Sequence, residues 1–194
     1  MKHVVVLGGG FAGVAALREL VQKKIDDFDI TLIDRNEYHL FTPSLYEVAT
    51  SEEPQKNVAI PFSELFGRKI HFVKGTVKQI NVKEQLVILL DETILPYDYL
   101  LITLGSETAY YNIPGLQEHA VAFKVLQDAL LIKQKVKTLC CKDGKYEKKV
   151  NIVIGGGGFA GTELAAELIT YKEGLAKQYG LDKDCLRLTI VQGS

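Results

Sequence analysis

Three glycines near the start of the chain have the spacing of a phosphate-binding turn. Gly8, Gly10 and Gly13 form the pattern G-x-G-x-x-G, which follows the apolar run 4–7 and precedes a segment that predicts a helix over 12–23. One glycine permits the tight bend, one lets the backbone approach a pyrophosphate, and one lets the helix pack on the strand. The helix N-terminus adds N–H groups and a positive dipole end. The pattern predicts a dinucleotide site; a glycine-rich turn without a ligand is the alternative.

An acidic residue follows at the distance that dinucleotide recognition requires. Asp34 lies 21 residues beyond Gly13, at the end of a second predicted strand over 30–34. A carboxylate in that place can accept hydrogen bonds from ribose hydroxyls. Strand, helix and strand together predict a βαβ unit of the Rossmann type.

The chain repeats this pattern 148 residues later. Positions 152–168 match positions 4–20 at nine of seventeen places, and the second motif consists of Gly156, Gly158 and Gly161. A strand again precedes the motif and a helical segment follows it, which argues against coincidence. Two motifs in one chain predict two dinucleotide sites.

The second unit differs at the position that corresponds to Asp34. Gln192 follows a strand predicted over 188–191, where an acid would be expected. A carboxylate there hydrogen-bonds a ribose diol and repels a 2′-phosphate, whereas an amide can hydrogen-bond without repelling. Gln192 therefore predicts weaker discrimination against NADPH. The alternative is that it only closes the strand.

Composition narrows the class of protein. The 194 residues carry a net charge of −1, with 47% hydrophobic and 24% charged residues, which is typical of a globular protein and does not predict a nucleic-acid partner. No apolar run is long enough for a membrane span, and residues 1–3 lead into a strand rather than a signal peptide. Cys140, Cys141 and Cys185 lack C-x-x-C or zinc-like spacing, so we expect incidental thiols in a reducing cytoplasm and no metal site.

Between the two motifs the sequence predicts the rest of an α/β domain. Three β-type runs predict a small antiparallel sheet, and a buried strand is expected over 99–104. The β-type runs are 70–74, 76–82 and 86–90. Further helical segments are expected over 45–49, 63–66 and 126–139. Turns are expected over 35–44, 95–98 and 143–145.

The repeat also predicts the domain organisation. We expect 1–112 to form a Rossmann-like domain with the small antiparallel insertion, 113–149 a connecting helix and turn, and 150–194 the first βαβ of a second Rossmann-like domain. The last unit, about 45 residues long, is too small to bury a core alone. Either this unit docks on the first domain or the chain is part of a larger protein, and we expect the latter.

Several segments resemble the type II NADH:quinone oxidoreductases of the pyridine nucleotide–disulfide oxidoreductase superfamily. They are residues 33–43 with 45–49, residues 154–167, and residues 97–106, which are similar to the superfamily's second flavin motif, YDxLxxATG. Thr103 and Leu104 depart from that motif, in which Ala and Thr are usual, whereas Gly105 is kept. The resemblance covers nearly the whole chain but only about the first half of a family member.

This resemblance implies an FAD enzyme that takes hydride from NADH or NADPH and passes electrons to a quinone or another small acceptor. It assigns the first motif with Asp34 to FAD and the second motif with Gln192 to NAD(P)H. It makes Glu163 catalytic, near flavin and nicotinamide; a carboxylate favoured by the helix dipole is the alternative. Further cofactor-binding residues implied by the resemblance are Phe11, Ala12, Arg35, His39, Pro43, Val77 and Gly105. A packing role is the alternative for His39.

The missing thiols separate the relatives within the superfamily. Disulfide reductases use a dithiol beside the flavin, and the peroxide and oxidase branch uses one thiol near 42–44; this sequence has neither. Three hypotheses remain: a quinone-reducing NAD(P)H dehydrogenase, a ferredoxin- or rubredoxin-reductase-like flavoprotein, and a dinucleotide-binding fragment without turnover. The first implies a peripheral place on the cytoplasmic face of the cell membrane, through a C-terminal part beyond this sequence, and is compatible with a homodimer.

Overall fold

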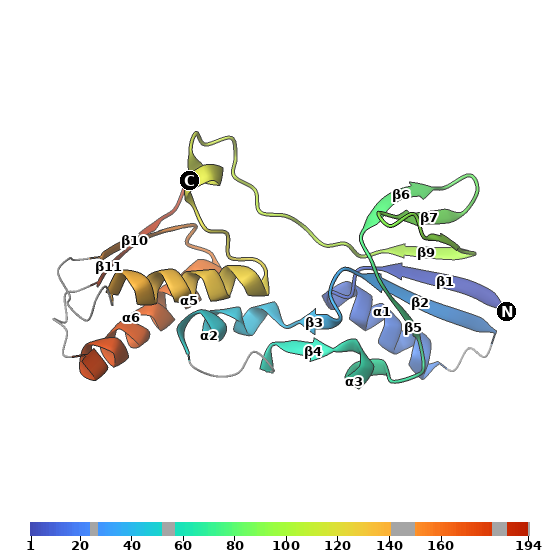
Figure 1. Cartoon of the computed structure of the whole chain (residues 1–194), viewed down its shortest axis with the longest axis horizontal. Helices are drawn as coiled ribbons and strands as arrows, with labels where there is room; N and C mark the ends of the chain where they lie inside the picture. The colour runs from blue at the N-terminus through green and yellow to red at the C-terminus, as the bar shows by residue number, and fades with distance from the viewer. Residues whose placement is uncertain (24–26, 52–56, 141–149, 180–185, 194) are drawn as a thin grey trace. The chain divides into compact units, whose positions relative to one another are not determined.

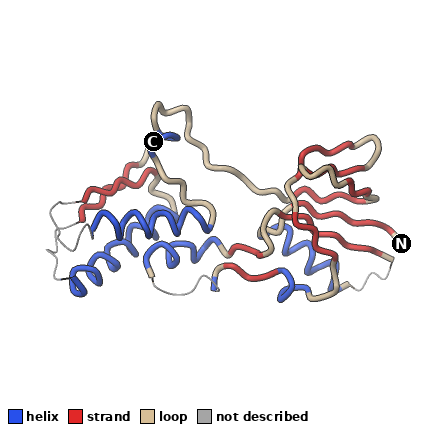
Figure 2. The backbone as a smooth tube through the Cα atoms, viewed as in Figure 1, coloured by secondary structure: helices blue, strands red, loops and turns tan. Residues whose placement is uncertain are grey.

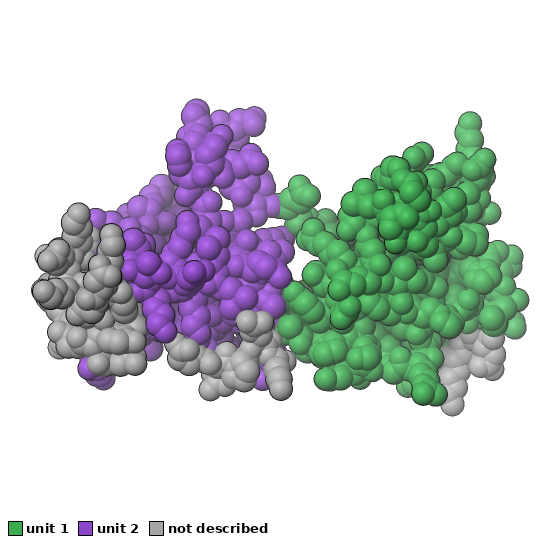
Figure 3. Space-filling model, in the orientation of Figure 1, with its two compact units in different colours: residues 1–41, 59–107 green, residues 42–58, 108–194 purple. Residues whose placement is uncertain are grey.

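The computed structural model of the chain describes residues 1–23, 27–51, 57–140, 150–179 and 186–193 (Figure 1). The chain forms two compact units, Met1–Phe41 with Ala59–Glu107 and Thr42–Val58 with Thr108–Ser194 (Figure 3). Each contains parallel strands joined through a helix, which confirms the predicted α/β class. Within the described residues, no helix is both long and apolar enough to cross a membrane.

The first unit is built on a four-stranded parallel sheet in the order β5-β2-β1-β9. Its strands are β1 (Lys2–Leu7), β2 (Phe28–Asp34), β5 (His71–Lys74) and β9 (Tyr99–Ile102). Helix α1 (Phe11–Gln22) connects β1 to β2, which pair in parallel with Leu7 opposite Ile33. This is the βαβ unit that the first glycine motif predicts (Figure 2).

Both faces of this sheet are covered, so each face has its own core. The strand residues that pack with α1 and the short helix α3 (Phe62–Phe66) are Val4, Val6, Ile30 and Leu32. Those that pack with the small antiparallel sheet are Val5, Leu7 and Ile33. Because successive side chains point to opposite faces and both faces are buried, residues 4–7 of β1 are all apolar.

The small antiparallel sheet has three strands, β6 (Val77–Asn81), β7 (Leu86–Leu89) and β8 (Ile94–Pro96), in that order. Two predictions are wrong here. The run 70–74 does not join this sheet; it gives β5, which pairs with β2 because Phe72 and Val73 supply apolar contacts to opposite faces of the parallel sheet. The turn expected over 95–98 begins within the edge strand β8, whose last residue is Pro96, where a missing N–H is tolerated.

Two local expectations are also corrected in the first unit. Strand β9 exists, but it is an outer strand of its sheet, with Tyr99 53% and Ile102 61% exposed, rather than a buried one. Within the segment 35–44, expected as a turn, β3 (Tyr38–Leu40) pairs antiparallel with β4 (Ala59–Pro61). Both differences arise because these strands pair with segments that lie far away in the sequence.

The second unit contains the repeated βαβ, formed by β10 (Val150–Gly155), α6 (Phe159–Tyr179) and β11 (Leu186–Val191). Its other helices are η1 (Thr42–Ser44), α2 (Leu45–Thr50), α4 (Leu116–His119) and α5 (Leu126–Cys140). Helix α2 packs against α5 and α6. The helices predicted over 45–49, 63–66 and 126–139 are confirmed, and the turn predicted over 143–145 lies outside the described residues.

The compact units divide the chain differently from the domains expected at 1–112, 113–149 and 150–194. Residues Thr42–Val58 pack within the second unit although they lie between β3 and β4 of the first. The units describe packing within this chain, and the assignment of nucleotide-binding domains stays a prediction.

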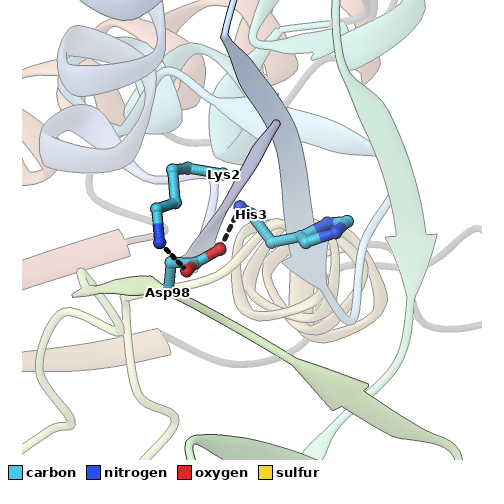
Figure 4. A network of polar contacts seen from close by, with 3 residues as sticks. All are labelled: Lys2, His3 and Asp98. Atoms are coloured by element: carbon cyan, nitrogen blue, oxygen red, sulfur yellow. Dashed lines mark hydrogen bonds and ion pairs between the residues drawn. The ribbon is translucent and has the colours of Figure 1, made fainter.

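Asp98 joins the starts of β1 and β9 in the first unit. Its Oδ1 accepts a hydrogen bond from Lys2 Nζ at 2.7 Å and its Oδ2 from the His3 backbone N–H at 2.7 Å (Figure 4). The Asp98 N–H donates in turn to the His3 carbonyl at 2.8 Å. The hydrogen bond from Lys2, with that from His3, holds the pKa of Asp98 below its ordinary value.

We predict that the stability of Asp98→Asn falls less steeply than that of wild type as the pH is lowered. A carboxylate whose pKa is lowered by folding stabilises the native state above its ordinary pKa, and this contribution is lost as the pH falls through the lowered value. Between about pH 5 and pH 2, the melting temperature of wild type should therefore fall further than that of Asp98→Asn. Thermal unfolding across this range measures it, with the exposed Glu118→Gln as a control that should keep the wild-type slope. Equal slopes for Asp98→Asn and wild type would contradict the prediction.

Candidate functional site: two glycine turns

The first glycine turn connects β1 to α1. Gly8 has a φ of +96°, which disfavours any residue with a Cβ, and its N–H donates to the Ile33 carbonyl at 2.8 Å. Gly10 is the N-cap of α1, and its carbonyl accepts the Val14 N–H at 2.9 Å. A Cβ on Gly13 would lie 1.9 Å from the Gly8 carbonyl oxygen. The helix can therefore begin at this distance from the strand only if position 13 is glycine.

The second glycine turn repeats this geometry between β10 and α6. Gly156 has a φ of +111°, and its N–H donates to the Val191 carbonyl at 2.8 Å. The Gly158 carbonyl accepts the Thr162 N–H at 3.0 Å. A Cβ on Gly161 would lie 2.0 Å from the Gly156 oxygen. The repeat in sequence is thus a repeat in backbone geometry.

The residue that ends the second strand plays the same part in both units. Asp34 Oδ2 accepts the Gly9 N–H at 2.7 Å, and Gln192 Oε1 accepts the Gly157 N–H at 2.6 Å. Asp34 Oδ1 also accepts the Asn36 N–H at 2.8 Å. Gln192 stands structurally where Asp34 stands, so it does more than close its strand. Its contact with a ligand stays a prediction.

The first turn is enclosed by residues from distant segments. A Cβ on Gly8 would meet the Thr103 carbonyl oxygen at 2.5 Å, and one on Gly9 would meet Phe62 Cζ at 2.1 Å. Thr103 Oγ1 lies 2.7 Å from the Gly8 carbonyl and 2.8 Å from the Leu7 carbonyl, within donating distance of both. Thr103 is one of the two residues that depart from the flavin motif, and its hydroxyl stabilises the turn through these hydrogen bonds.

The second turn is more open among the described residues. A Cβ on Gly156 would meet nothing within 4 Å, and one on Gly157 would meet only Gln192, at 3.4 Å or more. Phe159, which corresponds to Phe11, is 88% exposed. The two turns therefore have matching backbone geometry, but neighbouring residues enclose the first turn more closely than the second.

His39 is buried beside the first turn, with 5% of its surface exposed. Its Nδ1 donates to the Gly9 carbonyl at 2.9 Å. Its ring meets the ring of Phe11 edge to face, with centroids 4.9 Å apart, and Phe11 also contacts Phe41. His39 therefore lies at the turn, where its hydrogen bond fixes the Gly9 carbonyl.

The remaining expected residues are only partly gathered at the first turn. Ala12 lies in the first turn of α1, Arg35 is exposed directly after β2, and Val77 begins β6. Gly105 follows β9 with a φ of +78°. Pro43 lies exposed in η1, within the second unit.

Glu163 is exposed in the first turns of α6, a helix that packs against α2. The phenol of Tyr46, on α2, has its pKa raised by burial and then by the carboxylates of Glu47, Glu163 and Glu167. The carboxylate of Glu163 is therefore close enough to Tyr46 to contribute to the raised pKa of its phenol. Sequence reasoning did not find Tyr46, because only the packing of α2 on α6 brings these residues together. In the described part of the chain, no group of three or more His, Cys, Asp or Glu side chains could hold a metal ion.

Comparison with known proteins gives a consistent family. The family model described as pyridine nucleotide-disulphide oxidoreductase matches residues 2–192. Demethylphylloquinone reductase NdbB of Synechocystis sp. is 37% identical over 174 residues, covering 86% of this chain and 42% of that protein. The type II NADH:quinone oxidoreductase of Staphylococcus saprophyticus is 30% identical over 200 residues, covering 100% of this chain and 49% of that protein.

A solved structure has the same fold. NDH2 from Plasmodium falciparum, solved in complex with NADH, has a TM-score of 0.82 and 22% identity, covering 100% of this chain and 42% of that one. The chain therefore spans less than half the length of each of these three proteins.

We predict that the middle glycines of the two turns differ in their tolerance of a methyl group. Gly9→Ala forces the ring of Phe62 to move, and Phe62 is only 2% exposed, so the overpacking should cost roughly 3 kcal/mol of stability. Gly157→Ala, at the corresponding position, meets only ordinary contacts and should cost less than about 1 kcal/mol. Urea unfolding of both variants measures the difference, and Gly10→Ala, whose Cβ would meet nothing within 4 Å, is a second control. Equal losses of stability in Gly9→Ala and Gly157→Ala would contradict the prediction that Gly9, unlike Gly157, has no room for a methyl group.

Proposed function

Because the chain belongs to the pyridine nucleotide-disulphide oxidoreductase family, we propose that it supplies the two dinucleotide-binding turns of an FAD-dependent NAD(P)H dehydrogenase that reduces a quinone. The observation that carries this proposal is the pair of turns with matching geometry, one ended by Asp34 and one by Gln192. The relatives named NADH:quinone oxidoreductase and demethylphylloquinone reductase support the choice of reaction.

We assign FAD to the first turn. Gly10 is exposed there and leaves room for a close approach, and the N-terminus of α1 offers a positive dipole end to a pyrophosphate. Both oxygens of Asp34 accept backbone N–H groups, and each keeps a further lone pair for a ribose hydroxyl. Bound FAD would supply the hydride acceptor and the outlet for electrons. Phe11, Ala12, Arg35, Pro43, Val77 and Gly105 are the other residues assigned to this cofactor.

We assign NADH or NADPH to the second turn, with its pyrophosphate at Gly156, Gly158 and Gly161. Gln192 Oε1 is engaged with Gly157, and Nε2 donates to the Gly193 carbonyl at 2.7 Å. The second hydrogen on Nε2 can donate to a ribose hydroxyl or to a 2′-phosphate oxygen. An amide carries no charge to repel that phosphate.

Glu163 is the residue we assign to the chemistry between nicotinamide and flavin. It lies in the first turns of the helix that follows the second glycine turn, and its carboxylate is one of those that raise the pKa of the Tyr46 phenol. The role of Glu163 as a group near the reacting atoms is part of this proposal.

The sequence around the proposed flavin site lacks a thiol that could accept electrons. Residues 1–139 contain no cysteine, so the flavin turn and the segment after β3 offer no sulfur that could take electrons. We infer that electrons leave to an external acceptor, and the names of the relatives favour a quinone. As parts of the same proposal, the complete protein acts at the cytoplasmic face of a membrane and can form a homodimer.

We predict that the complete protein, loaded with FAD, oxidises NADH with a soluble quinone analogue as acceptor. The rate is followed by loss of NADH absorbance, with rubredoxin and ferredoxin as competing acceptors. Reduction of rubredoxin without reduction of quinone would favour a rubredoxin-reductase-like enzyme instead. The 194-residue chain alone is expected to show little turnover, and rapid turnover by it would contradict its place as one part of the enzyme.

We predict that Gln192→Glu in the complete protein raises the preference for NADH over NADPH. The new carboxylate would still accept the Gly157 N–H but would repel a 2′-phosphate, so the ratio of the two kcat/KM values should shift by about tenfold or more. Steady-state kinetics with both nucleotides measures the ratio. Asp34→Asn, at the corresponding position of the first turn, is the matched control and should leave it unchanged. An unchanged ratio in Gln192→Glu would reject this role of Gln192.

A further inference from the structure

The ring of His39 contacts both neighbours of Gly10. It donates through Nδ1 to the Gly9 carbonyl at 2.9 Å, and it packs edge to face on Phe11 with 4.9 Å between ring centroids. Since a carbonyl oxygen only accepts, Nδ1 must carry the hydrogen of this bond. Gly10, the N-cap of α1, lies between these two contacts.

The orientation of the Gly10 N–H follows from the first of these contacts. The described chain has no cis peptide bond, so the carbonyl of Gly9 and the N–H of Gly10 point in opposite directions from the peptide they share. A ring that holds the Gly9 oxygen therefore directs the Gly10 N–H away from itself. The preceding peptide is held by Asp34, which accepts the Gly9 N–H at 2.7 Å. Two successive peptides of the turn are thus fixed by two different side chains.

We propose that His39 is a positioning residue for this turn: it aims the Gly10 N–H at the pyrophosphate of the bound dinucleotide and acts only through the backbone. Gly10 is exposed, and a Cβ there would meet nothing within 4 Å, so the turn is open at this residue. The inference rests on the proposed function, which places FAD at this turn. It assigns His39 to the peptide rather than to the flavin.

The hydrogen-bond donor, rather than the bulk of the ring, is what this role requires. Asparagine carries an amide N–H on the same side-chain atom, Cγ, that carries Nδ1 in histidine. Leucine branches at that atom but has no donor. His39→Asn and His39→Leu therefore separate the donor from simple filling of the buried space.

The experiment measures the FAD dissociation constant of the complete protein, by titrating apoprotein with FAD and following flavin fluorescence. His39→Leu should raise this constant about tenfold, the worth of one net hydrogen bond, whereas His39→Asn should stay within about threefold of wild type. If His39→Leu does not fold, His39→Phe gives the same comparison, because it keeps a ring without a donor. Ile30→Val is the control: it thins the core beneath α1 and should lower the melting temperature of the apoprotein without changing the dissociation constant.

The outcomes distinguish the inference from the proposed function. If wild type binds FAD and His39→Leu binds it equally well, or if His39→Asn binds as weakly as His39→Leu, the positioning role is overturned while the proposed function stands. If wild type binds no FAD, the proposed function is overturned and this inference with it. Rescue by His39→Asn, with Ile30→Val at the wild-type constant, supports the role.

Discussion

The hydrogen bond between the middle residue of each glycine turn and the side chain that ends the second strand is the constraint on which both candidate sites depend. Gly9 donates it to Asp34, and Gly157 donates it to Gln192. The bond joins the C-terminal edges of two neighbouring parallel strands, which is where ligands bind in sheets of this kind. The same side chain that would contact a ribose therefore also fixes the backbone of the turn that would bind the phosphates. A substitution that removes the accepting oxygen of Asp34 or Gln192 therefore also removes a hydrogen bond that holds the backbone of its turn.

The parts of the fold that the sequence predicts are those set by local pattern. A strand, a glycine turn, a helix and a second strand follow one another within about 30 residues, and each signal of the motif can be read in order along the chain. The boundaries of β1, α1 and β2 accordingly agree with prediction to within about two residues. The repeat at 150–191 is found for the same reason.

The parts that the sequence does not predict depend on contacts between distant segments. Whether the run 70–74 joins a parallel or an antiparallel sheet is decided by its pairing with β2, about 40 residues earlier, and its composition suits either sheet. The exposure of β9 likewise follows from its outer place in the sheet. Thr103 and Phe62 were not expected at the first turn, since neither residue type signals contact with a glycine 50 or more positions away. Such contacts can be found only when the chain is folded.

The same three-glycine run carries different constraints in its two copies. At Gly9 the ring of Phe62 leaves no room for a Cβ, so packing alone requires glycine there. At Gly157 the described residues leave room, and packing does not require glycine. The pattern G-x-G-x-x-G is silent about its first x, yet in the first turn that residue contacts Asp34, His39 and Phe62 together. The motif therefore locates the turn, and the segments that enclose it decide how rigidly the turn presents its N–H groups to a ligand.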